Sequence, residues 1–452
     1  MTGRIPPKPA GRRGNVPLWR YARLFRRDIL SAQPDRLYGA WMAVFRTPFF
    51  RSAMVNDPEL INLLLKERPA DFPKSGRVSE GLRPLLGNSV FLTNGDDWAR
   101  QRRIIDPAFE GGRLRDSYPA MRAAAEAAAL RFEAAAGRET EVEAMTSHAA
   151  ADVIFRTLFS VPIEDQTAAE TFAAFRRYQR AQPVLNAGAL VPLPRWMPRL
   201  FRPGTRAAAR RIRGLIGAIT DRRQAEIAAG TAPADLATAI MTTNDPETGA
   251  RFEAQEMIDQ VAIFFLAGHE TSASALAWAL YLLALYPEWQ EQVASEALAA
   301  DFSDFTAVTG LRVTRDVFRE TLRLYPPVPM MVRETTQTEI FRKRRLAPCT
   351  QVVISPWHLH RHSRLWKNPD AFDPGRWQTG NGRDCARRAY IPFSAGPRVC
   401  PGAGFAMIEG ACLLAHILAA VRVELTDRPP PVPVAHLTVR AQSGIWLRLV
   451  RR

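Results

Sequence analysis

The sequence predicts a mostly helical, single-domain protein, and three observations support this fold class. Alanine-rich helical patterns fill residues 115–180 and 204–229. Short apolar runs suited to strands are fewer and lie at Ala53–Val55, Gln351–Ile354 and Ile445–Val450. From residue 45 to the end, no fixed-period repeat and no low-complexity linker marks a domain boundary. Residues 1–30 are rich in arginine and proline and are expected to form a basic, irregular arm.

Composition narrows the class of protein further. Hydrophobic residues make up 47% and charged residues 23% of the 452 residues, which argues against global disorder. The formal net charge of +16 favours anionic partners, and without a recognisable nucleic-acid-binding signature we favour an acidic protein over nucleic acid. Four cysteines without a CxxC pair fit a reducing cytoplasm, and no segment is typical of a signal peptide or a transmembrane span.

Local signals place several individual elements along the chain. Asp57 as N-cap followed by Pro58 predicts a helix that runs to about Arg68. The proline-containing segment Val184–Phe201 predicts a long loop or a broken helix. A long apolar helix is expected from about Phe252 to Tyr286, ended by Pro287, with a length on the order of 50 Å.

The most informative stretch contains a cysteine framed by glycines and preceded by an arginine. Glycines allow the backbone to approach a flat ligand and to direct amide groups at the sulfur. Those amides, the charge of Arg398 and the N-terminus of an apolar helix expected at Ala403–Leu418 would favour a thiolate at Cys400. An isolated cysteine is usually a buried structural residue, which is our expectation for Cys349, Cys385 and Cys412. The full stretch is Phe393-Ser394-Ala395-Gly396-Pro397-Arg398-Val399-Cys400-Pro401-Gly402.

This stretch resembles the haem-binding loop of the cytochrome P450 family at Phe393, Gly396, Arg398, Cys400 and Gly402. The resemblance implies haem b as cofactor, with the Cys400 thiolate as the proximal ligand of the iron. It also implies that Phe393 shields the sulfur and that Arg398 pairs with a haem propionate. The implied fold is a mainly α, triangular helical prism with a small β-rich lobe, formed as one family domain over residues 31–452.

A second motif, Ala267-Gly268-His269-Glu270-Thr271, interrupts the long apolar helix. A mid-helix threonine can bond to the carbonyl four residues earlier, and Gly268 leaves room beside it, so that the helix opens into a groove. An acid and a hydroxyl in such a groove can deliver protons, although a solvated Glu270 beside a tolerated Thr271 is the plainer interpretation of the pair alone. The motif is similar to the family's oxygen-activation motif, which implies that Thr271 holds the oxygen network and Glu270 relays protons. A zinc site of the HExxH type is disfavoured because Ala273 replaces the second histidine.

Glu320 and Arg323 lie three residues apart on one helix face, and Arg376 follows later in the chain. As a surface pair the first two would contribute about 0.2 to 0.5 kcal/mol. The family resemblance implies instead a buried network of Glu320, Arg323 and Arg376 that supports the haem loop, and buried charges need such complete pairing. Gly375 stands where the family most often has glutamate, which puts a secondary contact in doubt.

Further candidates concern the haem propionates and a possible metal site. Trp98 and Arg102 share one helical face and suit an anion, with a surface stack as the alternative. Arg333 falls where the family usually has another propionate-binding arginine. Three histidines alternate on an expected strand without a cysteine or carboxylate to complete a metal site, and we interpret them as structural: His358, His360 and His362.

The resemblance, which spans residues 98–402, implies a soluble, bacterial-type, cytoplasmic monooxygenase that inserts one oxygen atom from O2 into a lipophilic small molecule. The chain has no recognisable reductase motif, so electrons are expected from NAD(P)H through a separate ferredoxin or flavodoxin and its reductase. The alternatives are a peroxide-driven haem-thiolate hydroxylase and a non-catalytic haem sensor or carrier, while a hydrolase is disfavoured because no GxSxG elbow occurs.

Two surfaces follow from these expectations. A basic docking face for the acidic redox partner is expected at Arg100, Arg103, Arg383, Arg387 and Arg388. The substrate pocket is expected to be apolar and to be lined by Phe91, Phe264, Ala267, Val328, Met330, Met331 and Ile445.

Overall fold

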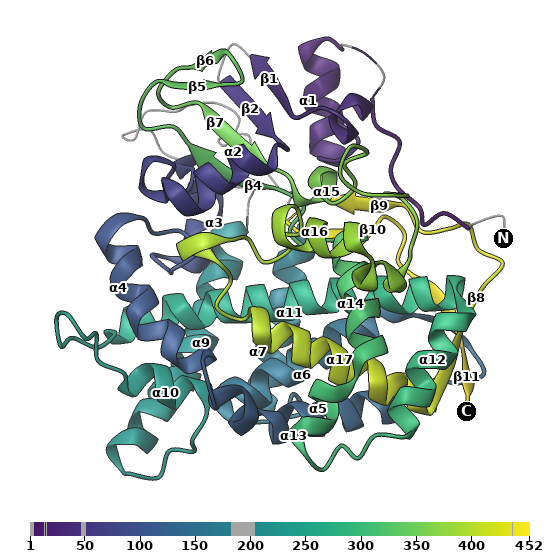
Figure 1. Ribbon diagram of the computed structural model, residues 1–452. Helices are drawn as coiled ribbons and strands as arrows, with labels where there is room; N and C mark the ends of the chain where they lie inside the picture. Colours follow the sequence, from purple (N-terminus) through teal and green to yellow (C-terminus); the bar gives the residue numbers. More distant parts are fainter. Residues whose placement is uncertain (1–3, 13, 15, 47–50, 182–203, 436) are drawn as a thin grey trace.

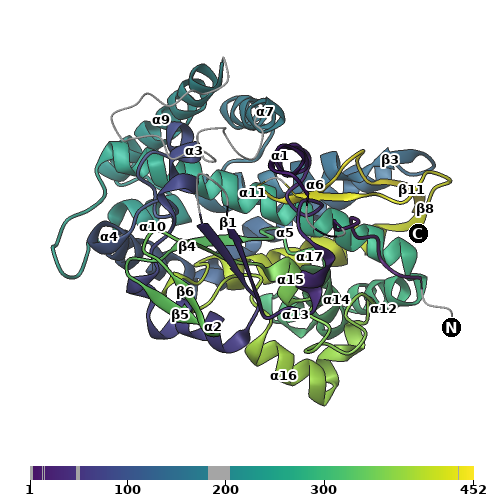
Figure 2. The same ribbon diagram turned by 90° about the horizontal axis from the view of Figure 1, so that it is seen from above.

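The computed structural model describes residues 4–452 except 13, 15, 47–50, 182–203 and 436. Helices form the body of the molecule, and short strands lie at its margins (Figure 1). Seen from above, helix α9, helix α16 and the sheet that contains β11 lie at three well-separated margins (Figure 2). The expected loop or broken helix at Val184–Phe201 lies outside the described residues.

The helices follow the patterns expected from the sequence in most places. The two alanine-rich regions form α5, α6 and α7 and, further along the chain, α9. The long apolar segment forms one helix of 32 residues, α11, which ends before Pro287. The described α-helices are α1 Leu18–Arg27, α2 Pro58–Asn62, α3 Gly76–Leu86, α4 Gly95–Ile105, α5 Arg113–Ala134, α6 Val142–Phe159, α7 Gln166–Ala181, α9 Thr205–Ala228, α10 Leu236–Thr242, α11 Ala254–Leu285, α12 Pro287–Leu298, α13 Phe305–Gly310, α14 Arg312–Leu324, α15 Pro356–Leu359, α16 Gly380–Arg388 and α17 Ala403–Ala420.

Several short turns of other helical types connect these elements. The Asp57 carboxylate accepts a hydrogen bond from the Glu59 amide at the start of α2, as expected for an N-cap, and the predicted helix continues as a π turn to Glu67. These turns are η1 Asp35–Tyr38, η2 Leu63–Glu67, η3 Pro69–Asp71, η4 Asp106–Phe109, η5 Pro374–Gln378 and η6 Gly396–Arg398.

The strands of the described residues form four small sheets, and the three runs expected from the sequence are all strands. In the largest sheet, β2 pairs in parallel with β7, and β1 and β4 pair antiparallel to them at the two edges. Its strands are β1 Met42–Arg46, β2 Arg51–Val55, β7 Gln351–Ile354 and β4 Met331–Glu334. The other sheets are β3 Glu139–Glu141 with β11 Trp446–Arg451 and β8 Val421–Leu425, β5 Glu339–Phe341 with β6 Arg344–Leu346, and β9 Pro433–Ala435 with β10 Val439–Ala441.

The core is built around α11, which crosses the middle of the molecule with α17 beside it (Figure 1). Most side chains of α11 are buried, because α6, α9, α14 and α17 cover it from several directions. Helix α17 is long and apolar enough to span a membrane, but more than half of it is buried against α5, α11, α12 and α14. Its hydrophobicity is therefore accounted for by packing inside the helical body.

Three local expectations are wrong. The basic N-terminal segment contains a helix, α1, at residues where an irregular arm was expected. His358 lies in α15, and His360 and His362 follow it outside any helix or strand, because Ser355 caps a short helix there in place of a strand. Cys349 is exposed, in a turn with a positive φ of 60°, whereas Cys385 and Cys412 are buried as expected.

Candidate functional site

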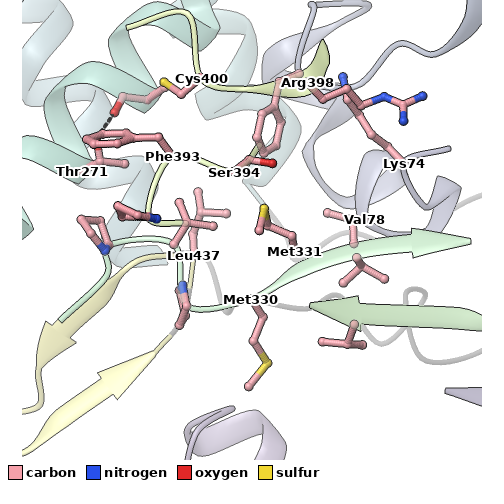
Figure 3. A pocket seen from close by; sticks show the side chains of 18 of the residues that line it. Lys74, Val78, Thr271, Met330, Met331, Phe393, Ser394, Arg398, Cys400 and Leu437 are labelled. Carbon is pink, nitrogen blue, oxygen red and sulfur yellow. Dashed lines mark hydrogen bonds between the residues drawn. The ribbon is translucent and has the colours of Figure 1, made fainter. Parts of the chain in front are cut away.

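A cavity of about 1100 Å³ lies between α11, the loop that carries Cys400 and the largest sheet. Cys400, Phe393 and Thr271 lie on one side of it, and Met330 lies on the other (Figure 3). The lining is mainly apolar, so the cavity can bury a lipophilic molecule next to the cysteine.

The Cys400 loop is held in a tight bend. The Cys400 amide donates to the Phe393 carbonyl at 2.9 Å, which closes the loop around η6. Gly396 has a φ of +68°, and a Cβ there would lie 1.9 Å from the Leu65 carbonyl oxygen, so glycine is required where the loop meets η2. Burial raises the pKa of the Cys400 thiol, and the Gly402 amide and the charge of Arg102 oppose that rise. The cation that acts on the sulfur is thus Arg102, whereas the sequence suggested Arg398.

Helix α11 brings Thr271 to the same cavity. The Thr271 hydroxyl donates to the Ala267 carbonyl at 2.5 Å, the back-bond expected from the sequence. Gly268 has a further reason to be glycine, because a Cβ there would lie 2.3 Å from Cδ1 of Ile154 on α6. The groove therefore depends on close packing of α6 against α11 as well as on the threonine.

Glu270 faces away from the cavity. Its carboxylate accepts a hydrogen bond from the Thr438 hydroxyl at 2.8 Å and forms an ion pair with Arg440 at 3.1 Å. Glu270 is 8% exposed in its side chain, while that of Arg440 is 39% exposed, so the pair connects the buried helix with the protein surface. This geometry suits exchange of protons between solvent and α11.

A second buried carboxyl group, Glu409, was missed in the sequence. It lies on α17, lines the cavity and accepts a hydrogen bond from the Ser272 hydroxyl at 2.6 Å. Burial raises the pKa of Glu409 to about 8, so this side chain is largely protonated at neutral pH. A lone acid within the apolar run after Cys400 was the signal that could have identified it.

Partly buried cations gather at another part of the cavity. Lys74, Arg102 and Arg398 all lie near the face of Trp98, with the charged groups 5.7, 5.9 and 5.2 Å from the ring centre. Burial and the charges of Arg333, Arg398 and Arg102 lower the pKa of Lys74 to about 6. Sequence reasoning found the tryptophan and the three arginines but missed Lys74, which no motif marks. Figure 3 shows Lys74 and Arg398 next to each other.

This cationic group fits the two carboxylates of haem b. The Nε atoms of Arg333 and Arg398 are buried and have no hydrogen-bond partner among the described residues. No described carboxylate forms an ion pair with Lys74, Arg333 or Arg398, although Arg102 pairs with Asp106 at 2.7 Å. An anionic group between these side chains would supply the missing acceptors. Together with an accessible cysteine sulfur and a large apolar cavity, the residues fit haem b.

The Glu320 network joins α14 to η5, and the Glu320 carboxylate is fully paired. Glu320 and Arg323 have fully buried side chains and form two hydrogen bonds, of 2.8 and 2.9 Å. Arg376 Nε donates to the same carboxylate at 2.9 Å, and the Asp373 amide adds a fourth bond at 3.1 Å. Burial alone would raise the pKa of Glu320, but the two arginines outweigh it and hold the pKa below its ordinary value. Gly375, which stands where the family most often has glutamate, contributes no side chain to this network.

Most of the expected pocket residues line the cavity. Ile445 does not, because it is fully buried in the helical core, where its carbonyl accepts from the Val142 amide. Val78 and Leu437 line the cavity and were not anticipated. The expected residues that do line it are Phe91, Phe264, Ala267, Val328, Met330 and Met331.

Two arginines of the expected docking face are already paired. Arg100 forms an ion pair with Glu256, and Arg103 binds Asp245 at 2.6 Å and Glu247 at 3.1 Å. Arg387 and Arg388 are exposed and share one carboxylate, Asp384. Arg383 donates to the Gln378 carbonyl.

Comparison with known proteins gives a consistent result. The model of the family described as "Cytochrome P450" matches residues 28–447. Cyclooctatin synthase of Streptomyces melanosporofaciens is 32% identical over 401 residues, which cover 86% of this chain and 83% of that protein. Cyclooctat-9-en-7-ol 5-monooxygenase of the same organism is 32% identical over 431 residues, 92% of this chain and 89% of the relative. The fold is similar to that of a crystallised cytochrome P450DA haem domain, with a TM-score of 0.78, 23% identity and coverage of 99% and 97% of the two chains.

Proposed function

The chain belongs to the cytochrome P450 family and is a haem-dependent monooxygenase, and on this premise we propose that it oxygenates a cyclic terpenoid with electrons supplied by separate redox proteins. The observation that carries the proposal is the apolar cavity of about 1100 Å³ into which both Cys400 and Thr271 face. Two relatives whose names concern cyclooctatin and a cyclic alkenol support a terpenoid as substrate.

The chain's residues position the cofactor and the substrate. Haem b supplies the iron at which dioxygen is activated. Cys400 would provide the thiolate that binds this iron, Phe393 would cover the sulfur, and Trp98, Arg102, Arg333 and Arg398, joined by Lys74, would hold the propionates; all of these residues line the cavity. Gly402 acts through its backbone, because its amide opposes the rise in the pKa of the Cys400 thiol.

Proton supply is assigned to two side chains of α11. Thr271 donates to Ala267 and so presents an acceptor oxygen to the cavity, where it orders the hydrogen bonds around the reacting atoms. Glu270, tied to Thr438 and to the partly exposed Arg440, exchanges protons with solvent and relays them along α11. A monooxygenase that uses O2 and two electrons consumes two protons for each hydroxylated product, so it needs a route for protons from solvent.

Electrons come from NAD(P)H through a ferredoxin or flavodoxin and its reductase. Arg387 and Arg388 on α16 precede the Cys400 loop in the chain and are exposed, which suits an acidic partner. Arg100 and Arg103 do not contribute to this face as free charges, since Glu256 and Asp245 pair with them.

The experiment that tests the proposal measures coupling of electron use to product. Thr271→Ala should leave the reduced carbon monoxide complex with its red-shifted Soret band, while a larger share of consumed NAD(P)H appears as hydrogen peroxide. Thr271→Ser keeps the hydroxyl and is the matched control, with coupling close to that of the unmodified enzyme. Unchanged coupling in the alanine variant would contradict the role of Thr271. A Cys400→Ser variant that keeps the red-shifted band would contradict the ligand assignment.

A further inference from the structure

The N-terminal segment closes one end of the cavity with polar side chains. In Figure 1, α1 lies on one side of α11, and α17, the helix that follows Cys400, lies on the opposite side. The part of the lining that this segment contributes contains both apolar and charged residues. The residues of this segment that line the cavity are Arg12, Val16, Tyr21, Phe25, Ile29, Gln33 and Arg36.

The charges around the cavity are strongly unbalanced. Among the described lining residues Glu409 is the single carboxylate, and it is the one next to Ser272 on the Cys400 side. The propionate-binding group accounts for Lys74, Arg102, Arg333 and Arg398. The other lining cations are Arg12, Arg36, Arg46 and Arg77.

Arg12 is held rigidly at this end of the cavity. Its Nε donates to the Ala32 carbonyl at 2.8 Å and its Nη1 donates to the Gly14 carbonyl, while Tyr21 lies under the guanidinium at 5.9 Å. These bonds leave Nη2 without a hydrogen bond among the described residues. A guanidinium fixed in this way loses little conformational entropy when it binds an anion.

Arg36 adds a second positive charge beside the first. Both side chains line the same cavity, and Arg36 is exposed. Burial lowers the pKa of Arg12, Tyr21 opposes that shift, and the charge of Arg36 lowers the pKa further, so the two cations repel each other. No described carboxylate forms an ion pair with either one; the neighbouring Asp35 contacts Arg12 through its backbone amide, at 3.4 Å from the Arg12 carbonyl. An anion between the two guanidiniums would relieve this repulsion and gain charge-assisted hydrogen bonds.

We propose that Arg12 and Arg36 form a subsite for the anionic head group of an amphipathic substrate, whose apolar body extends through the cavity toward Thr271. Tyr21 and Gln33, which line the same end, supply neutral polar contacts. A carboxylate and a phosphate monoester share the required chemistry. This inference rests on the proposed function and deepens it, because an anchored head group directs oxygenation to carbons remote from the acid.

The test uses the haem-loaded enzyme and one C20 isoprenoid skeleton with four head groups. Abietic acid, abietyl monophosphate, abietol and methyl abietate, which share one ring skeleton, are titrated while the Soret shift that reports displacement of solvent from the haem is recorded. We expect at least one anionic compound to bind about tenfold or more tightly than the methyl ester, the range of a hydrogen bond to a charged group. The relative affinity of acid and monophosphate then identifies which anion the subsite prefers.

Variants of the two arginines test whether they cause the preference for anionic head groups over the methyl ester. Arg12→Gln with Arg36→Gln should reduce the preference for the anion to about threefold or less and leave affinity for the ester unchanged. Arg23→Gln, an exposed position on α1 outside the cavity, is the matched control and should keep the full preference. The reduced carbon monoxide spectrum verifies that each variant is folded, and the single Arg36→Gln variant replaces the double one if haem content falls.

Three results would overturn the inference. These are equal binding of anion and ester by the unmodified enzyme, an unchanged preference in the arginine variants, and the absence of any spectral shift with both anions. Binding of the neutral alcohol or ester in these cases would leave the proposed monooxygenase function intact, so the two proposals fail separately.

Discussion

The chain buries positive charge in two regions and balances it in opposite ways. In the Glu320 network, Arg323 makes five hydrogen bonds, to the Glu320 carboxylate and to the carbonyls of His360, Pro369 and Ala371. In the group around Lys74, the Nε atoms of Arg333 and Arg398 lack any partner among the described residues. The first region is complete with protein groups alone, whereas the second requires an anionic group from outside the chain.

The largest effect is expected when the balanced network is broken. Glu320→Gln leaves two buried guanidiniums without a carboxylate and should cost about 3–5 kcal/mol of folding free energy. The measurement is thermal unfolding together with the yield of haem-loaded protein. Glu291→Gln removes an exposed ion pair with Arg452 and is the control, with an expected cost of about 0–1 kcal/mol. Equal losses in the two variants would contradict the distinction between buried and exposed pairs.

Replacement of Lys74 in the unbalanced group should not lower the folding stability of the haem-free protein, in contrast to Glu320→Gln. In the haem-free protein the pKa of Lys74 is about 6, so at pH 5 its charged form is repelled by Arg333, Arg398 and Arg102. Lys74→Gln removes this charge but keeps a donor for the Val90 and Thr93 carbonyls, so stability of the haem-free protein at pH 5 should be unchanged or higher. The same variant should release haem several-fold faster, measured by transfer to excess apomyoglobin. Lys66→Gln, an exposed position on η2, should change neither quantity. A clear loss of stability in the haem-free Lys74→Gln variant would show that Lys74 is structural.

Glu409 extends the comparison to a buried acid without a cation. Its pKa is raised from 4.5 to about 8, so the protonated form is favoured in the folded state. The resulting stabilisation is fully present below pH 4.5 and is lost as pH rises toward 8. Glu409→Gln stays neutral, so its melting temperature relative to the unmodified protein should increase between pH 5 and pH 8. A difference that is independent of pH would show that Glu409 does not titrate in this range.

The smallest effect is expected for exposed charges. Arg387 and Arg388 share Asp384 on the surface, where salt screens their field over about 10 Å at 0.1 M ionic strength. Arg387→Glu with Arg388→Glu should slow reduction by an acidic ferredoxin at low salt and flatten its dependence on ionic strength, as measured by stopped flow. Substrate affinity should not change. If the reduction rate depends neither on ionic strength nor on the charge reversal, α16 is not part of the docking face.

Local sequence patterns were sufficient for the elements whose signals lie within a few residues. The cap at Asp57, the long helix that ends at Pro287 and the back-bond from Thr271 to Ala267 all appear as predicted, because each depends on neighbours along the chain. The histidines near residue 360 show the limit of such patterns. Their alternation was compatible with a strand, but Pro356 and the Ser355 cap start a short helix there.

The sequence by itself determined the mainly α fold, the family, the cysteine loop and the order of its supporting motifs, since these reside in contiguous residues. Only the tertiary structure decided which distant side chains share a space. It turned Glu270 toward Thr438 and Arg440, placed Lys74 beside Arg333 and Arg398, buried Ile445 away from the cavity and brought Arg12 to its edge. The physical reason is that burial and charge balance depend on contacts between segments hundreds of residues apart, which no local pattern records.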